Sequence, residues 1–147
     1  MDNLPKSVLF ACTENSVRSP MAEGIMRSFH GRSILIESVG VFAGHRDLFM
    51  IETMKEIDID MSDHQSRIFG SVADDTFDYV IALSTHAQNT AVELTRYVEC
   101  EVMLWNTFDP TVVEGSRDVR LNAYREVRDF LIRRILEVFP VPNERVF

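Results

Sequence analysis

Hydrophobic and polar positions along the chain form two kinds of pattern, short apolar runs and longer stretches with apolar residues at helical spacing. Apolar runs bounded by polar or turn residues are typical of buried strands, whereas a repeat of three to four residues is typical of helices that cover a core. Each of the four apolar runs is followed by a stretch with helical spacing. We therefore predict strands at 7–11, 34–39, 78–83 and 100–104, and helices at 18–30, 48–57, 86–97 and 118–138.

The alternation of predicted strands and helices defines the fold class. Consecutive strands separated by helices form a parallel sheet with right-handed crossovers, and the helices then cover both faces of the sheet. The chain has 147 residues, enough for one hydrophobic core, and no repeat, low-complexity tract or Pro/Gly/Ser-rich linker divides it. We therefore predict an α/β protein, a three-layer sandwich with a four-stranded parallel sheet flanked by helices on both faces, in which residues 1–147 form a single domain.

Charge and composition exclude several classes of partner. The chain has 15 Lys and Arg against 23 Asp and Glu, a formal net charge of −8, which argues against broad binding of nucleic acid or of an anionic membrane. No apolar run approaches the roughly 18 residues of a membrane-spanning helix, and the first residues show no signal-peptide pattern. We expect a cytoplasmic protein with no nucleic-acid and no membrane partner. The arginines from Arg117 to Arg134 are expected to form a solvated helix face, with the docking of an acidic partner as the alternative.

Neither the cysteines nor the histidines form a metal-ligand motif. The two cysteines, Cys12 and Cys100, are too few for a disulfide scaffold, and neither has a second cysteine at Cys-x-x-Cys spacing. The four histidines are scattered, without HExxH or His-x-His spacing. We therefore expect free thiols, no metal and no other cofactor, with Cys100 as a structural thiol at the start of a strand.

The segment after the first predicted strand has the composition of a reactive anion site. A loop that leads from a strand into a helix points several backbone N–H groups at one position, and the helix dipole adds positive potential there. A cysteine in such a loop, here Cys12, is favoured as a thiolate and hence as a nucleophile. Arg18 closes the loop and can bind two oxygens of a tetrahedral oxyanion. Ser19 is placed to donate a hydrogen bond to the Cys12 sulfur.

Residues 8–23, VLFACTENSVRSPMAE, resemble the signature of the low-molecular-weight protein tyrosine phosphatase family. The resemblance continues through 37–40, 64–67, 77–81 and 109–110, in the order that the family has. It implies a parallel sheet with strand order 2-1-3-4 and the metal-independent hydrolysis of phosphomonoesters through a cysteinyl-phosphate. The implied substrate is a phosphorylated protein or a small phosphomonoester, and we expect a monomer or a weak dimer.

The resemblance also implies a role for each site residue. Cys12 attacks phosphorus, Arg18 binds the phosphoryl oxygens, and Asp109, followed by Pro110, acts first as general acid and then as general base. The phosphate-binding loop between Cys12 and Arg18 consists of Thr13, Glu14, Asn15, Ser16 and Val17. Asn15 holds the loop in shape through a left-handed backbone conformation, and Ser38 supports the loop by hydrogen bonding.

Several positions depart from the family pattern. Glu14 replaces the usual glycine, so we expect its side chain to point outward and to weaken phosphate binding, with strain if its φ is positive. Val17 replaces a frequent second cysteine of the loop. Residues 111–113 replace the aromatic residues that often follow the Asp-Pro pair, and this leaves Phe42 or Phe108 as an aromatic wall for the substrate.

Two other functions are compatible with the sequence. Arsenate reductases of the same fold use two further cysteines, which the segment 83–88 lacks, so this alternative requires an external thiol. The second alternative is a catalytically weak module that binds phosphate or a phosphoprotein. Asp47 and Asp78 are fallback candidates for the general acid, and His64 is expected to be a hydrogen-bonded packing residue.

Overall fold

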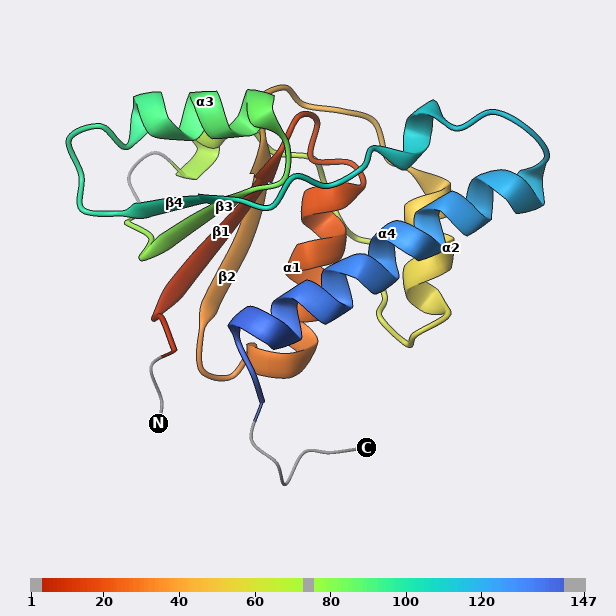
Figure 1. Ribbon diagram of the computed structural model, residues 1–147, viewed down its shortest axis with the longest axis horizontal. Helices are drawn as coiled ribbons and strands as arrows, with labels where there is room; N and C mark the ends of the chain where they lie inside the picture. Colours follow the sequence, from red (N-terminus) through yellow and green to blue (C-terminus); the bar gives the residue numbers. More distant parts are fainter. Residues whose placement is uncertain (1–3, 73–75, 142–147) are drawn as a thin grey trace.

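A parallel four-stranded sheet forms the centre of the protein, shown in Figure 1 as a computed structural model that describes residues 4–72 and 76–141. The sheet has the order β2-β1-β3-β4, so the predicted fold class and strand order are confirmed. Its strands are β1 (Ser7–Cys12), β2 (Leu35–Gly40), β3 (Tyr79–Ala82) and β4 (Glu101–Leu104). Cys12 pairs with Gly40, while Ala11 pairs with Ala82. The carboxyl ends of the strands therefore meet at one edge of the sheet, the edge at which ligands bind in such folds.

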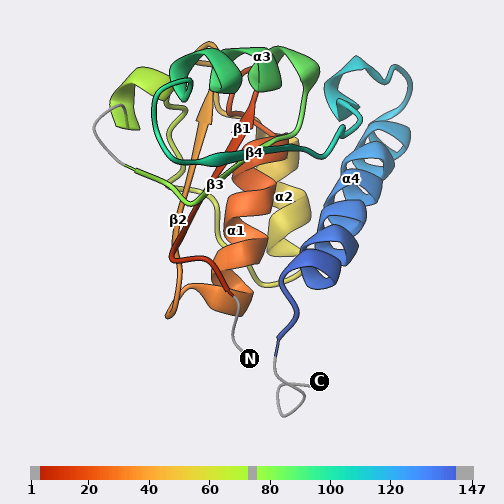
Figure 2. The same cartoon turned by 60° about the vertical axis from the view of Figure 1, so that its left-hand side comes forward.

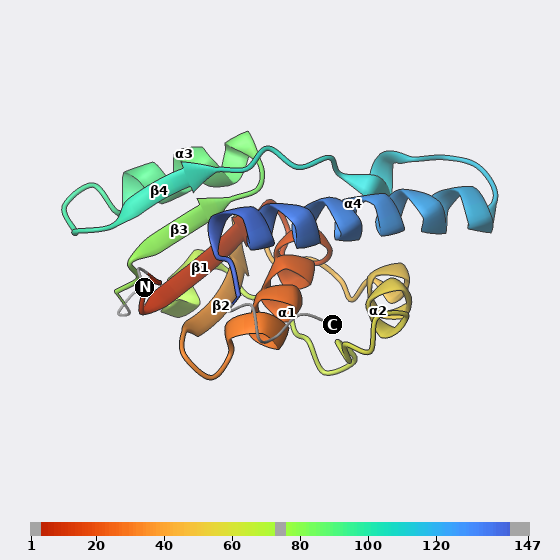
Figure 3. The same cartoon turned by 60° about the horizontal axis from the view of Figure 1, so that its bottom comes forward.

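Helices cover both faces of the sheet (Figures 2 and 3). On one face lie α1 (Arg18–His30), α2 (Leu48–Lys55) and α4 (Arg117–Val138), and on the other lie α3 (Thr85–Leu94) and the 3-10 helix η1 (Phe69–Val72). A second 3-10 helix, η2 (Pro110–Val112), connects β4 to α4. Within the described part of the chain, no helix is long and apolar enough to cross a membrane.

The helix at 86–97 is shorter than predicted, because α3 ends at Leu94. Ala91 is the last buried position of α3, and the side chains at 92–99 are exposed or only partly buried. The hydroxyl of Thr95 donates to the Ala91 carbonyl and, together with the Thr95 N–H, closes the helix. Apolar residues beyond Ala91, such as Val92 and Tyr97, thus continue the helical pattern without a surface to pack on.

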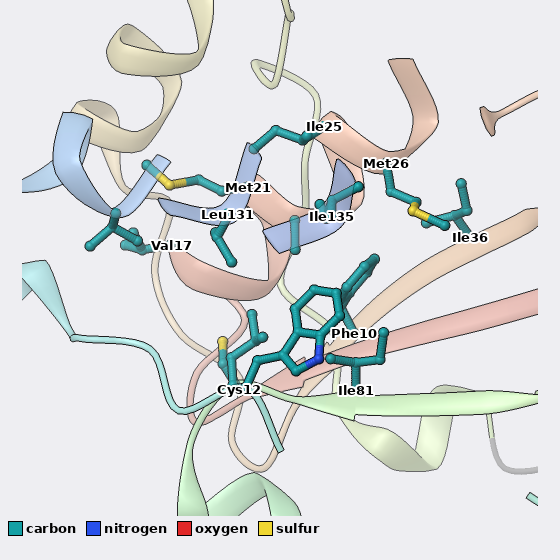
Figure 4. Close-up of a cluster of buried hydrophobic side chains, with 14 of the residues drawn as sticks. Phe10, Cys12, Val17, Met21, Ile25, Met26, Ile36, Ile81, Leu131 and Ile135 are labelled. Carbon is teal, nitrogen blue, oxygen red and sulfur yellow. The ribbon is translucent and has the colours of Figure 1, made fainter. Parts of the chain in front are cut away.

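Side chains along β1 alternate between the two faces of the sheet and determine where Cys12 points. Phe10 and Cys12 lie in the hydrophobic cluster on the side of α1 and α4, with Met21 and Leu131 among their neighbours (Figure 4). Leu9 belongs to the cluster on the opposite face, beside the small residues of α3. Because strand side chains alternate with a period of two, the Cys12 sulfur is directed toward the amino end of α1.

Polar contacts join α2 to α4 on the outside of this layer. Arg128 was expected on a solvated helix face, but it is buried, and its guanidinium donates to the Thr53 carbonyl at 2.7 Å and to Glu56 at 2.8 Å. Arg125 donates to the same carboxylate at 2.8 Å. The expectation of a fully solvated arginine face is therefore wrong, because acidic and carbonyl groups at the end of α2 accept from two of these arginines.

Glu56→Gln tests this contact between α2 and α4. The hydrogen bond from Arg125 is the main reason that the pKa of Glu56 falls from 4.5 to about 2. Desolvation opposes this shift, and the hydrogen bond from Arg128 adds to it. A carboxylate whose pKa is lower in the folded state than in the unfolded state stabilises the fold at pH values above the unfolded-state pKa. This contribution is lost as the pH falls toward and through the folded-state pKa. Because Glu56 is partly exposed, we expect a loss of only about 1 kcal/mol in the free energy of unfolding at neutral pH.

Urea denaturation at pH 7 and pH 3 measures the loss, which should be smaller at the lower pH. Glu137→Gln is the matched control, because it removes an exposed ion pair with Arg134 within α4. It should change the stability by less than about 0.5 kcal/mol. Equal losses for Glu56→Gln at the two pH values, or a loss no larger than that of the control, would contradict this account.

Candidate active site

The loop between β1 and α1 is held in place by its neighbours in the sheet. The N–H groups of Val41 and Phe42 donate to the carbonyls of Cys12 and Thr13, so the chain after β2 runs beside the loop. Thr13 Oγ1 also lies 3.2 Å from the hydroxyl of Ser84, the residue that caps α3. The loop thus has a fixed path at the carboxyl edge of the sheet.

The amino end of α1 has no side-chain cap. Val17 occupies the N-cap position and makes no capping hydrogen bond, whereas α2, α3 and α4 are capped by Asp47, Ser84 and Ser116. The first N–H groups of a helix lack partners within the helix and attract negative charge. In α1 the Met21 N–H donates to the Val17 carbonyl and Pro20 has no N–H, while the Ser19 N–H faces the Cys12 sulfur, so the positive end of the helix is directed at the loop that Cys12 begins.

Three donors surround the buried Cys12 sulfur. The N–H groups of Asn15 and Ser19 lie 3.3 and 3.4 Å from Sγ, and Ser19 Oγ lies 3.0 Å from it. Ser19 Oγ also has the Val39 carbonyl as an acceptor at 3.3 Å. A thiolate has no proton to donate, so a hydrogen bond between Ser19 Oγ and the ionised sulfur uses the one hydroxyl proton of Ser19 in place of the bond to the Val39 carbonyl. This arrangement stabilises the charge of a thiolate.

Asn15 is the centre of a buried hydrogen-bond network. Its φ is 55°, so the expected left-handed backbone conformation is confirmed. Its Nδ2 donates to the hydroxyls of Ser19 at 2.8 Å and Ser38 at 2.9 Å, and its Oδ1 accepts from the Arg67 N–H at 2.8 Å. Ser38 in turn donates to Glu23 at 2.5 Å. The Asn15 side chain thus connects the loop to α1, to β2 and to the segment before η1.

Arg18 and Asp109 face each other across the mouth of the loop. Arg18 donates to the Thr107 carbonyl at 3.1 Å, and its Nη2 lies 4.0 Å from Asp109 Oδ2. Asp109 Oδ1 accepts from the Thr111 N–H at 3.0 Å and from the Thr111 hydroxyl at 2.7 Å. Asp109 is thereby the N-cap residue of η2. These bonds occupy Oδ1 and leave Oδ2 directed toward Arg18.

A pocket of about 120 Å³ lies between the loop and Asp109. It is lined by Cys12, Thr13, Glu14, Ser16, Val17, Arg18, Asp109 and Thr111. Asn15 and Ser19 are buried behind this lining and their N–H groups contact the Cys12 sulfur, while Ser38 is buried behind Asn15 and accepts from it. A larger hollow of about 560 Å³ between segment 106–108 and α4 is lined by Phe108, a candidate for the aromatic wall, but by none of the predicted catalytic, loop or loop-support residues. The structure thus brings all the predicted site residues together around or directly behind the smaller pocket.

Other predicted candidates lie outside this pocket. Asp47 caps α2 and accepts from the Tyr124 hydroxyl at 2.8 Å, while Asp78 lies at the amino end of β3 and accepts from the Lys6 N–H. Phe42 and Phe108 are exposed, and neither lines the pocket. In the part of the chain that the structure describes, no three His, Cys, Asp or Glu side chains gather as a metal site would require.

Segment 64–67 supports the loop in a way that the sequence analysis did not assign. The Ser66 hydroxyl donates to the Glu14 carbonyl at 2.7 Å, the Arg67 N–H donates to Asn15, and His64 Nε2 lies 3.0 Å from the Asn15 carbonyl. The resemblance of residues 64–67 to the family was the one sequence signal for these contacts. Among described non-glycine residues, only Asn15 and Asp58 have a positive φ, so the strain considered for Glu14 does not arise.

Comparisons with known proteins identify the family of this chain. The family model for low molecular weight phosphotyrosine protein phosphatase matches residues 7–137. The arsenate reductase of Bacillus subtilis strain 168 is 30% identical over 132 residues, which cover 90% of this chain and 94% of the relative.

Solved structures show the same arrangement of the chain. An arsenate reductase in its phosphate-binding state has a TM-score of 0.73 at 28% identity, and the match covers 90% of this chain and 95% of the other. The tyrosine phosphatase Wzb from Escherichia coli K30, in complex with sulphate, has a TM-score of 0.72 at 20% identity, with 92% and 99% of the two chains covered. From the extent of the family match and the identity of the relatives, we conclude that this chain belongs to the low molecular weight phosphotyrosine protein phosphatase family.

Proposed function

We propose that this protein is a metal-independent phosphomonoester hydrolase of the protein tyrosine phosphatase type, with a cysteinyl-phosphate intermediate on Cys12. The observation that carries the proposal is the environment of the Cys12 sulfur, which has three hydrogen-bond donors behind it and the pocket of Arg18 and Asp109 in front. Family membership supports the same reaction. The proposed substrate is a phosphorylated protein or a small phosphomonoester.

In the first step, the loop N–H groups and Arg18 bind the nonbridging oxygens of the phosphoryl group. The Cys12 thiolate attacks phosphorus, so an S–P bond forms while the bond to the leaving oxygen breaks. Asp109 Oδ2, at the opposite side of the pocket, protonates that oxygen. Arg18 stabilises the charge on the transferring group through two parallel hydrogen bonds.

In the second step, water hydrolyses the intermediate. The Asp109 carboxylate accepts a proton from the water, a new P–O bond forms, and the S–P bond breaks. The sulfur leaves as a thiolate, and Ser19 Oγ, 3.0 Å away, donates to it at that moment. Inorganic phosphate departs and the thiolate is restored.

Cys12→Ser tests the nucleophile. A neutral hydroxyl in the same place is a much weaker nucleophile than a thiolate, so hydrolysis of para-nitrophenyl phosphate without added metal should fall by at least about 1,000-fold. Cys100→Ser is the control, because Cys100 lies outside the pocket, and it should keep the activity. A folded wild-type protein without turnover, or a Cys12→Ser variant with full activity, would contradict the proposal, and the former result would favour a phosphate-binding module.

Asp109→Asn tests the general acid. The need for protonation grows with the basicity of the leaving oxygen, so kcat/KM, which reports the steps through departure of the leaving oxygen, should fall about 100-fold on phenyl phosphate and much less on para-nitrophenyl phosphate. Asp78→Asn removes the same charge at the other end of the sheet and is the control. Equal losses on the two substrates, or the same pattern in the control, would contradict the assignment.

Asn15→Ala and Asn15→Gly test the support of the loop. Both variants lose the hydrogen bonds to Ser19 and Ser38, but only glycine adopts a positive φ without strain. We expect both to lower kcat/KM by at least about tenfold, and the alanine variant to lose about 1 kcal/mol more stability than the glycine variant. Unchanged kcat/KM in Asn15→Gly would show that the side-chain bonds do not support catalysis.

Arsenate reduction is the second candidate function, because the curated relative named above is an arsenate reductase. Cys100 precedes β4 and lies level with the start of β1, about 16 Å along the strands from Cys12. A disulfide needs Cα atoms within about 7 Å, so these two cysteines cannot pair in this fold. Reduction would therefore need an external thiol.

Arsenite formation from arsenate with glutathione or thioredoxin measures this alternative directly. The proposed phosphatase should turn over para-nitrophenyl phosphate equally well with and without a thiol reductant, and it should form little arsenite. Rapid arsenite formation by a protein that hydrolyses no phosphomonoester would favour the reductase.

A further inference from the structure

The mouth of the phosphate pocket has an unusual set of side chains for a site that receives an anion. Its lining contains two carboxylates, those of Glu14 and Asp109, and a single cation, Arg18. The lining contains no aromatic side chain. The part of a bound substrate that extends out of the pocket through this mouth therefore lies beside negative charge and not beside an aromatic side chain.

Glu14 is fixed at the mouth through its backbone. Its carbonyl accepts from Ser66 Oγ at 2.7 Å and from Ser16 Oγ at 3.4 Å. Gly44 packs directly against it, because a Cβ at Gly44 would lie 2.9 Å from both the Cβ and the carbonyl oxygen of Glu14. The base of the side chain is thus held on both sides, while the side chain itself is exposed.

The carboxylate of Glu14 has no ionic partner among the residues that the structure describes. Arg18 is directed at Thr107 and Asp109, and neither His45 nor Arg46, the exposed basic residues after Gly44, forms an ion pair with Glu14. Asp109 differs, because its Oδ2 lies 4.0 Å from the guanidinium of Arg18. Glu14 is therefore the carboxylate at the mouth whose charge is free to interact with a ligand.

A free carboxylate beside a phosphate site repels a substrate whose only charges are negative. A positive charge next to the phosphoryl group would turn this repulsion into an attraction, since the carboxylate would then pair with that charge. The net charge of −8 acts in the same direction over longer distances and favours basic ligands. Glu14 thus distinguishes substrates that carry the same phosphoryl group but differ in the charge next to it.

We propose that Glu14 is a specificity-determining residue that favours phosphopeptides with a lysine or arginine next to the phosphorylated residue. This inference rests on the proposed phosphatase function and identifies its substrate class. Glu14 takes no part in the bonds that form and break. It acts on the neighbouring side chain of the substrate while Arg18 and the loop bind the phosphoryl group.

Two phosphotyrosine peptides that differ only in flanking lysine or glutamate residues test the proposal. The wild-type protein should show a kcat/KM about fivefold higher for the lysine peptide, the size expected for an exposed charge pair. Glu14→Gln keeps the shape but not the charge, and it should abolish most of this preference. The preference of the wild-type protein should also shrink as KCl is raised from 0.05 to 0.5 M, because salt screens exposed charges.

Inorganic phosphate provides a second readout that needs no peptide. Without the repulsion from Glu14, phosphate should inhibit the Glu14→Gln variant about two- to fivefold more strongly than the wild type. Glu114→Gln is the control, because Glu114 is exposed and does not line the pocket. It makes the same change in net charge and should leave both the preference and the phosphate inhibition unchanged.

Each outcome decides the inference. Equal hydrolysis of the two peptides by the wild type, or a preference that persists in Glu14→Gln, would overturn it while the phosphatase function stands. The same loss of preference in Glu114→Gln would attribute the effect to net charge and overturn the role of Glu14. Failure to hydrolyse para-nitrophenyl phosphate as well as both peptides would instead refute the proposed function on which the inference rests.

Discussion

The shape of the phosphate-binding loop depends on the buried side chain of Asn15 and the left-handed backbone beneath it. A non-glycine residue in that conformation costs on the order of 1 kcal/mol, and a buried amide without partners would cost about 1–3 kcal/mol more. Asn15 offsets these costs because both ends of its amide are bonded, Nδ2 to Ser19 and Ser38 and Oδ1 to the Arg67 N–H. The turn at Asn15 directs its own N–H and that of Ser19 at the Cys12 sulfur.

The parallel sheet brings the remaining groups to this loop. β1 ends at Cys12, and the segment after β4 returns along the same edge, anchored by the bond from the Thr107 N–H to the Leu83 carbonyl. The Thr107 carbonyl then accepts from Arg18, which holds the guanidinium near the mouth of the pocket. Asp109 follows two residues later and caps η2. Residues almost 100 positions apart in sequence thus meet because parallel strands end at one edge.

Much of this fold could be predicted from the sequence because its signals are local. The apolar run of β1, the helical spacing of α1 and the position of Cys12 between them are properties of a short segment. The support by Asn15 and Ser38 was predicted through the resemblance to the family, and the observed hydrogen bonds agree with it.

Other features depend on contacts between distant segments and have no local signal. Arg128 has the sequence context of a solvated helix face, and only the approach of α2 buries it. The end of α3 follows from the lack of a packing surface beyond Ala91, which the apolar pattern does not reveal. The bond from Ser66 to Glu14 joins residues 52 positions apart. The exclusion of Phe42 and Phe108 from the pocket lining likewise depends on how the loops pack.

The central claim is that Cys12 carries the phosphoryl group between the two steps, and trapping the intermediate tests it most directly. The protein would be mixed with para-nitrophenyl phosphate, quenched rapidly in acid and digested, and the site of phosphorylation located by mass spectrometry. The account predicts one phosphoryl group, on Cys12, that appears with substrate and disappears as substrate is consumed. Turnover without phosphorylation of Cys12, or with the phosphoryl group on another residue, would contradict it.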